Sequence, residues 1–78
     1  MHILYVRPMT ATEPDYAALN AELTDLNTRA SLRQHDGHPI REDDGTQQIQ
    51  IPDAREVFRV KHLLRTAYGL IIDREWRG

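Results

Sequence analysis

The stretch PDYAALNAELTDLNTRA, residues 14–30, decides the fold because it contains the clearest helix signal in the sequence. Side chains three and four residues apart lie on one face of a helix. The apolar residues at these spacings are Tyr16, Leu19, Leu23, Leu26 and Ala30. The sequence therefore predicts an amphipathic helix with one buried face.

The two ends of this helix are predicted from capping chemistry. Thr12 or Glu13 is expected to cap its start, since Pro14 needs no amide partner in the first turn and Asp15 suits the helix dipole. The end has two alternatives. The helix either stops near residue 29, so that residues 31–35 begin a strand, or it continues until Gly37 supplies a C-terminal cap.

Strands are expected at both ends of the chain. Residues 2–6 are rich in β-branched and aromatic side chains and stop at Pro8, and residues 70–72 are apolar. Residues 73–78 are charged and are interpreted as a polar tail that carries Trp76.

Two turn signals, at residues 36–37 and 43–45, lie between the helices, and either could connect a hairpin. We favour a hairpin that joins residues 39–42 to residues 46–51. Side chains alternate between the two faces of a strand. In the second strand, Ile49 and Ile51 are expected to point inward, and Gln48 and Gln50 outward.

A second helix follows Pro52. Asp53 is a natural N-cap, and Glu56 three residues later completes a capping-box pattern. Gly69 is expected to end the helix. Its apolar face is predicted from Val57, Val60, Leu64, Ala67 and Tyr68.

The predicted order is β-α-β-β-α-β within one domain, residues 1–78. Right-handed crossovers would place both helices on one face of a four-stranded antiparallel sheet, which is the ferredoxin-like arrangement. The alternative is another α+β fold in which the first strand pairs differently. The ferredoxin-like fold hosts many unrelated functions, so it says little about function.

Composition narrows the class of protein. The chain has 78 residues, of which 40% are hydrophobic and 28% charged, and it contains no cysteine. These values are typical of a small folded domain and leave no disulfide framework or thiolate site. Neither a membrane span nor a signal peptide is recognised, so we expect a cytoplasmic protein without a membrane partner.

No catalytic, cofactor or metal site is predicted. His35 and His38 lie near Asp36, but their spacing matches no established metal motif. The carboxylates at residues 42–44 fall in an expected exposed turn, where they stay ionised and make poor general acids. The glycines are too dispersed for a phosphate-binding loop.

Charge is unevenly distributed around a net value of −2. Residues 1–53 hold four Arg against nine acidic residues, and residues 54–78 hold six Arg or Lys against three. Helical geometry gathers one set of cations and a histidine on and beside the outer face of the second helix. The members of this basic face are Arg55, Arg59, Lys61, His62 and Arg65.

Further partner-binding candidates lie elsewhere. Glu42, Asp43 and Asp44 form an acidic loop that would suit a basic groove. Trp76 belongs to the residue type most enriched at binding hot spots, although it could instead cover the core. The sheet face opposite the helices is half apolar and would suit a partner or a homodimer.

These features favour a non-enzymatic protein-interaction module that binds a larger protein or a nucleoprotein complex, as a monomer or homodimer. Small domains without an active site are often regulators or inhibitors, including phage-type proteins that disable a host machine, such as anti-CRISPR inhibitors. The alternative is a nucleic-acid-binding domain that uses the basic face of the second helix.

Overall fold

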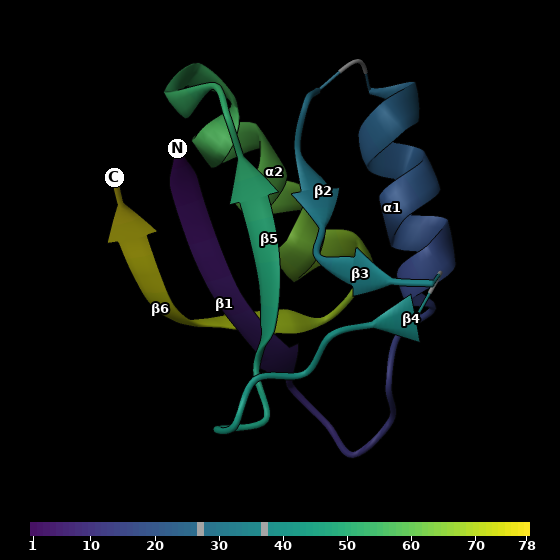
Figure 1. Ribbon diagram of the computed structural model, residues 1–78. Helices are drawn as coiled ribbons and strands as arrows, with labels where there is room; N and C mark the ends of the chain where they lie inside the picture. Colours follow the sequence, from purple (N-terminus) through teal and green to yellow (C-terminus); the bar gives the residue numbers. More distant parts are fainter. Residues whose placement is uncertain (27, 37) are drawn as a thin grey trace.

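The computed structural model describes residues 1–26, 28–36 and 38–78 (Figure 1). It is an α+β fold with a four-stranded antiparallel sheet in the order β2-β5-β1-β6 and two α-helices. The sheet contains β1 (His2–Pro8), β2 (Ser31–Leu32), β5 (Gln47–Ile51) and β6 (Leu70–Arg77). The helices are α1 (Tyr16–Asp25) and α2 (Val57–Ala67).

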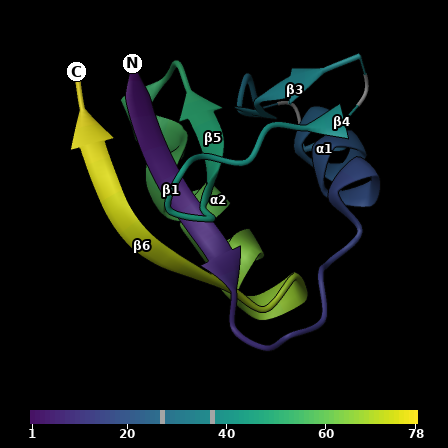
Figure 2. The ribbon, with the colours of Figure 1, turned by 60° about the horizontal axis from the view of Figure 1, so that its bottom comes forward.

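The fold contains an additional hairpin whose strands flank the first turn signal, at residues 36–37, which the sequence offered as one of two possible hairpin turns but not as a separate sheet. It is formed by β3 (Gln34–His35) and β4 (His38–Pro39), which make a two-stranded sheet of their own among the described residues. Figure 2 shows this hairpin set apart from the main sheet and next to α1. A bond of 2.6 Å from Arg41 to Glu13 ties the segment after β4 to the segment before α1.

The central strand β1 organises the core. Leu4 and Val6 are fully buried, and Leu4 lies opposite Ile49 of β5. Alternation then directs the intervening residues of β1 to the other face of the sheet. Leu19 and Leu23 of α1 and Val60 and Leu64 of α2 pack in the same core.

Helix α1 confirms the predicted apolar face over its length, since Tyr16, Leu19 and Leu23 are buried. The predicted cap was wrong by two or three residues. Asp15 is the N-cap, and its carboxylate accepts a bond of 3.0 Å from the Ala18 amide. The helix ends at Asp25, about one turn before the shorter alternative near residue 29, and the alternative cap at Gly37 lies outside the described residues.

The predicted hairpin partner of β5 was wrong. β5 pairs with β1 and with β2, and the expected segment at residues 39–42 contributes only a bridge from Arg41 to Gln47. Leu32 of β2 is buried opposite Ile49, so the core selects this pairing. The inward orientation of Ile49 and Ile51 is confirmed because both are fully buried.

Helix α2 begins after a single 3₁₀ turn, Ala54–Glu56. Asp53 caps this turn by accepting the Arg55 amide at 3.0 Å, so Glu56 ends the turn and does not close a capping box. The predicted face of α2 is confirmed at Val60 and Leu64, whereas Ala67 is exposed.

The last strand is longer than predicted. β6 continues to Arg77, so the expected polar tail is a strand paired with β1. The register shifts between Tyr5 and Val6, which lie opposite Arg74 and Ile72, and Asp73 is the extra residue of a bulge. Neither α1 nor α2, the α-helices of the described residues, has the length and apolar content that crossing a membrane requires.

Candidate partner-binding surface

The basic face predicted on the second helix is largely neutralised. Arg55 lies in the 3₁₀ turn, where its guanidinium donates to both carboxylate oxygens of Asp53 at 3.1 and 2.9 Å. These bonds keep the pKa of Asp53 below its usual value. Arg59 lies 3.5 Å from the carboxylate of Glu56, one turn earlier. Both arginines therefore contact acids close to them in sequence.

Lys61 points toward the sheet. Its Nζ donates to Oε1 of Glu75 on β6 at 2.7 Å, and the side chains of Lys61 and Glu75 are each only 20% exposed. The imidazole of His2 contacts the other oxygen of Glu75. The lysine bond, followed by the histidine contact, holds the pKa of Glu75 below its usual value. This cluster joins α2, β1 and β6.

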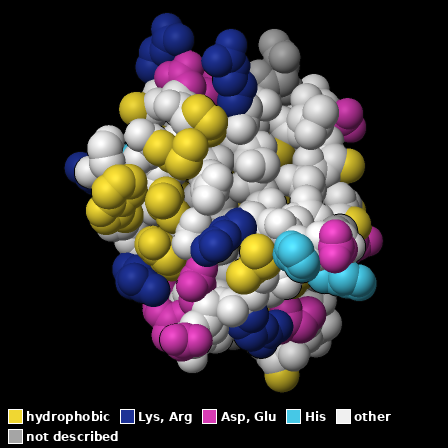
Figure 3. Space-filling view, viewed as in Figure 1, with side chains coloured by type: hydrophobic (Ala, Val, Ile, Leu, Met, Phe, Trp, Pro, Cys, Tyr) yellow, Lys and Arg dark blue, Asp and Glu magenta, His cyan; other side chains and the backbone are white. Residues whose placement is uncertain are grey.

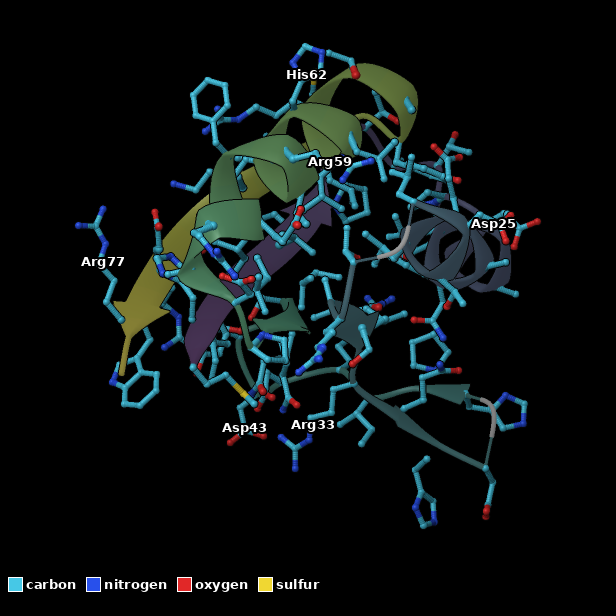
Figure 4. All side chains as sticks on the ribbon, turned by 90° about the horizontal axis from the view of Figure 1, so that it is seen from above. Asp25, Arg33, Asp43, Arg59, His62 and Arg77 are labelled. Carbon is cyan, nitrogen blue, oxygen red and sulfur yellow. The ribbon has the colours of Figure 1, made fainter. Side chains whose placement is uncertain are left out.

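The outer side of α2 retains His62 and Arg65, both exposed. Figure 4 shows Arg59 and His62 on this helix. Within the described part of the chain, no carboxylate lies within 4.0 Å of Arg65. Phe58 is 84% exposed on the same helix. The sequence analysis did not select Phe58, although an aromatic residue outside the predicted apolar face of the second helix indicates an exposed ring.

Two carboxylates of the acidic loop, Glu42 and Asp44, also bind other side chains of the same chain. Glu42 accepts bonds from the guanidinium of Arg33 at 3.2 Å and from the side-chain amide of Gln48 at 2.9 Å. Asp44 accepts the hydroxyl of Thr46 at 2.6 Å, which is the main cause of its lowered pKa, and also binds Arg74 at 3.0 Å. Asp43, the middle residue of this loop, is exposed, and Figure 4 labels it together with Arg33.

The sheet face opposite the core carries the candidate surface. Ile3 lies opposite Trp76, and Tyr5 lies opposite Arg74. The Arg74 guanidinium stacks 3.9 Å from the centre of the Tyr5 ring. Trp76 and Met1 are both 53% exposed. We call Met1, Ile3, Tyr5, Arg74 and Trp76 the Trp76 surface.

Figure 3 views this open face and shows hydrophobic side chains gathered over the β1 and β6 side, with Lys and Arg around them. The neighbouring part of the sheet is polar. Gln50 donates its side-chain amide to Gln48 at 3.1 Å, and Gln48 binds Glu42. The Trp76 surface therefore lies beside a polar part of the sheet in which Gln50, Gln48 and Glu42 bind one another.

His35 and His38, the histidines considered for a metal site, do not form one among the described residues. His35 and His38 lie opposite each other in the β3–β4 hairpin, and His35 is 3.4 Å from the carboxylate of Asp36. Both of these side chains are more than 80% exposed. Across residues 1–26, 28–36 and 38–78, no group of three or more His, Asp or Glu side chains is placed to hold a metal ion.

An open groove of about 460 Å³ lies between the segment after β1 and the end of α2. Glu13 on its wall binds Arg41 at 2.6 Å, and this bond is the main reason that the pKa of Glu13 is lowered. An ionised, paired carboxylate is a poor general acid. The lining residues are Met9, Thr10, Thr12, Glu13, Pro14, Asp15, Ala67, Tyr68 and Gly69.

Comparisons of the chain with protein-family models, with curated proteins and with solved structures found no match. What the chain does must therefore be inferred from its own surfaces.

Proposed function

We propose that the chain is a non-enzymatic protein-interaction module that binds a larger protein or a nucleoprotein complex through the Trp76 surface. The observation that supports this proposal is the 53% exposure of Trp76 within a paired strand. Trp and Arg are enriched at binding hot spots. A tryptophan whose backbone is already fixed loses little conformational freedom on binding, which favours affinity.

The alternative, nucleic-acid binding through α2, has weaker support. Arg55, Arg59 and Lys61 each contact a carboxylate of this chain. Phosphates would have to compete with these carboxylates, and the release of bound counterions that drives nucleic-acid binding would be smaller.

A regulator or inhibitor of a host machine, of the phage type, is the role we propose for such a module, and we propose that it acts in the cytoplasm. We also propose a ferredoxin-like architecture with the β3–β4 hairpin inserted. Its support is the strand order β2-β5-β1-β6, in which β1 and β5 are central and β2 and β6 lie at the edges.

The proposal is tested by affinity capture from an extract of the source cells with quantitative mass spectrometry. Trp76→Ala should reduce the recovery of a specific partner at least about tenfold, as expected for a hot spot. Met9→Ala is the matched control, because Met9 is 62% exposed in the loop after β1. Circular dichroism verifies that both variants fold. Equal recovery with both variants would contradict a role for the Trp76 surface.

A second arm addresses nucleic acid directly. Fluorescence anisotropy with labelled single-stranded and duplex DNA and RNA should show no binding at physiological salt. Binding that is abolished by the double change Arg55→Ala and Arg59→Ala would establish the alternative function instead.

A further inference from the structure

The outer edge of β6 is free in the described sheet. β6 is the last strand in the order β2-β5-β1-β6 and pairs with β1 on one side. In Figure 1 no other element lies beyond it. The backbone amides and carbonyls that point outward from such a strand can pair with a strand of another chain.

Exposed aromatic side chains flank this edge on both sides. Trp76 projects from the open face of the sheet. On the helix side, the bond from Lys61 to Glu75 identifies the flank of α2 that faces β6. Phe58, three residues before Lys61, lies along the same side of the helix and is 84% exposed. A strand added at this edge would cover both rings.

We propose that this edge binds a second copy of the chain, with the two β6 strands antiparallel about a two-fold axis. Such an axis keeps the helices of both copies on one side of a continuous eight-stranded sheet. Directly opposite residues then point to the same face. The bulge at Asp73 interrupts the alternation, so continuous pairing is confined to residues 74–78.

Charge selects one register within this segment. An axis at Arg74, Glu75 or Arg77 places two like charges directly opposite each other, which is destabilising. An axis at Trp76 avoids this. It also places Glu75 opposite Arg77 of the partner subunit, twice by symmetry, and brings the two Trp76 rings together on the open face.

Arg77 is available for this contact. Its side chain is 77% exposed, and its Nε lies 3.8 Å from Oε2 of Glu75 in its own chain, which is beyond hydrogen-bond distance. Figure 4 shows Arg77 pointing away from the rest of the molecule at the end of β6. At the opposite edge of the sheet, β2 has only two residues. The two-fold contact therefore closes as a dimer and does not propagate.

The contact is small, since it combines a five-residue strand pairing with two aromatic side chains from each copy. It falls below the roughly 800 Å² per partner of a standard stable interface. We therefore expect a reversible dimer with a dissociation constant in the micromolar range. The dimer and the proposed partner would compete for Trp76, so the weak dimer dissociates when the partner binds. The dimer requires no other protein, so its absence would leave the proposed partner binding intact.

Sedimentation equilibrium of the full chain tests the dimer over a concentration series from about 5 to about 500 µM, which brackets micromolar dissociation constants. Phe58→Ala and Arg77→Glu should each weaken dimerisation about tenfold or more, the first by removing an aromatic anchor and the second by opposing two acidic residues. Met9→Ala should leave it unchanged. Hydrogen exchange should slow at the outward-pointing backbone amides of Glu75 and Arg77 as the concentration rises, because the amide of Gly78, and by alternation those of Arg74 and Trp76, point toward β1.

A chain that remains monomeric at the highest concentration would overturn the proposal. So would a dimer that neither Phe58→Ala nor Arg77→Glu weakens, because it would use another surface. Phe58 is almost fully exposed, so Phe58→Ala should fold normally and keeps the test decisive if Arg77→Glu disturbs β6.

Discussion

Replacing Glu75 by Gln is expected to lower the free energy of unfolding at pH 7 by about 1–2 kcal/mol, because bonds to charged groups contribute about 1.5–3 kcal/mol and glutamine keeps one acceptor. Glu75 accepts Lys61 at 2.7 Å and contacts His2, in a site where its side chain is only 20% exposed. At roughly 2.1 cal/mol/K of unfolding entropy per residue, a chain of this size should lose about 6–12 °C in Tm.

The loss should depend on pH in one direction. Lys61 and then His2 lower the pKa of Glu75 in the folded state relative to the unfolded value, for which 4.5 is the reference. The carboxylate therefore stabilises the fold fully above the unfolded pKa, and this contribution disappears as the pH falls through the folded pKa. The difference between the natural chain and Glu75→Gln should be largest near neutrality and shrink well below pH 4.5.

Urea unfolding followed by circular dichroism at pH 7, 5 and 3 measures this difference, at low concentration so that the dimer dissociates. Asp73→Asn is the matched control on the same strand. Asp73 binds Arg7 at 3.0 Å, but the two side chains are 40% and 49% exposed. Such surface pairs contribute about 0.2–1 kcal/mol. A loss at Glu75 no greater than at Asp73, or one independent of pH, would refute the reasoning.

Four further substitutions, one of them a control, test the fold that supports the surface. Leu64→Ala should cost about 3 kcal/mol in urea unfolding because Leu64 is fully buried, whereas Phe58→Ala on the same helix should cost under about 0.5 kcal/mol; equal losses would contradict the orientation of α2. Asp15→Ala should cost about 1 kcal/mol by removing the cap of α1, and an unchanged Tm would show that the cap contributes nothing. Gly45→Ala should cost about 1 kcal/mol in thermal unfolding because φ is +86° there, and a gain in stability would contradict that conformation.

The features that sequence predicted well are local. Spacings of three and four residues identified Leu19, Leu23, Val60 and Leu64 as buried, and alternation identified the inward face of β5. Helical and strand geometry alone determine which residues share a face. These predictions therefore did not depend on knowing which elements meet.

The errors concern pairings between distant residues. Residues 39–42 looked like a strand partner for β5, but the partner is β2, whose Leu32 fits the core opposite Ile49. The charged end of the chain looked like a tail because the bulge at Asp73 breaks the alternation that would mark a strand. Only the assembled sheet shows Glu75 facing Lys61 and His2, and Trp76 opposite Ile3.

The charged residues were the most visible binding candidates in the sequence, yet the expected free energies of binding favour Trp76. When phosphate replaces a carboxylate on Arg55 or Arg59, one ion pair is exchanged for another, and exposed pairs are worth only about 0.2–1 kcal/mol each. Burial of the exposed part of Trp76, on the order of 100 Å², stabilises a complex by about 2–3 kcal/mol. One aromatic side chain thus outweighs several neutralised cations. For this reason, we expect the affinity for a partner to depend more on contacts with Trp76 than on contacts with the outer face of α2.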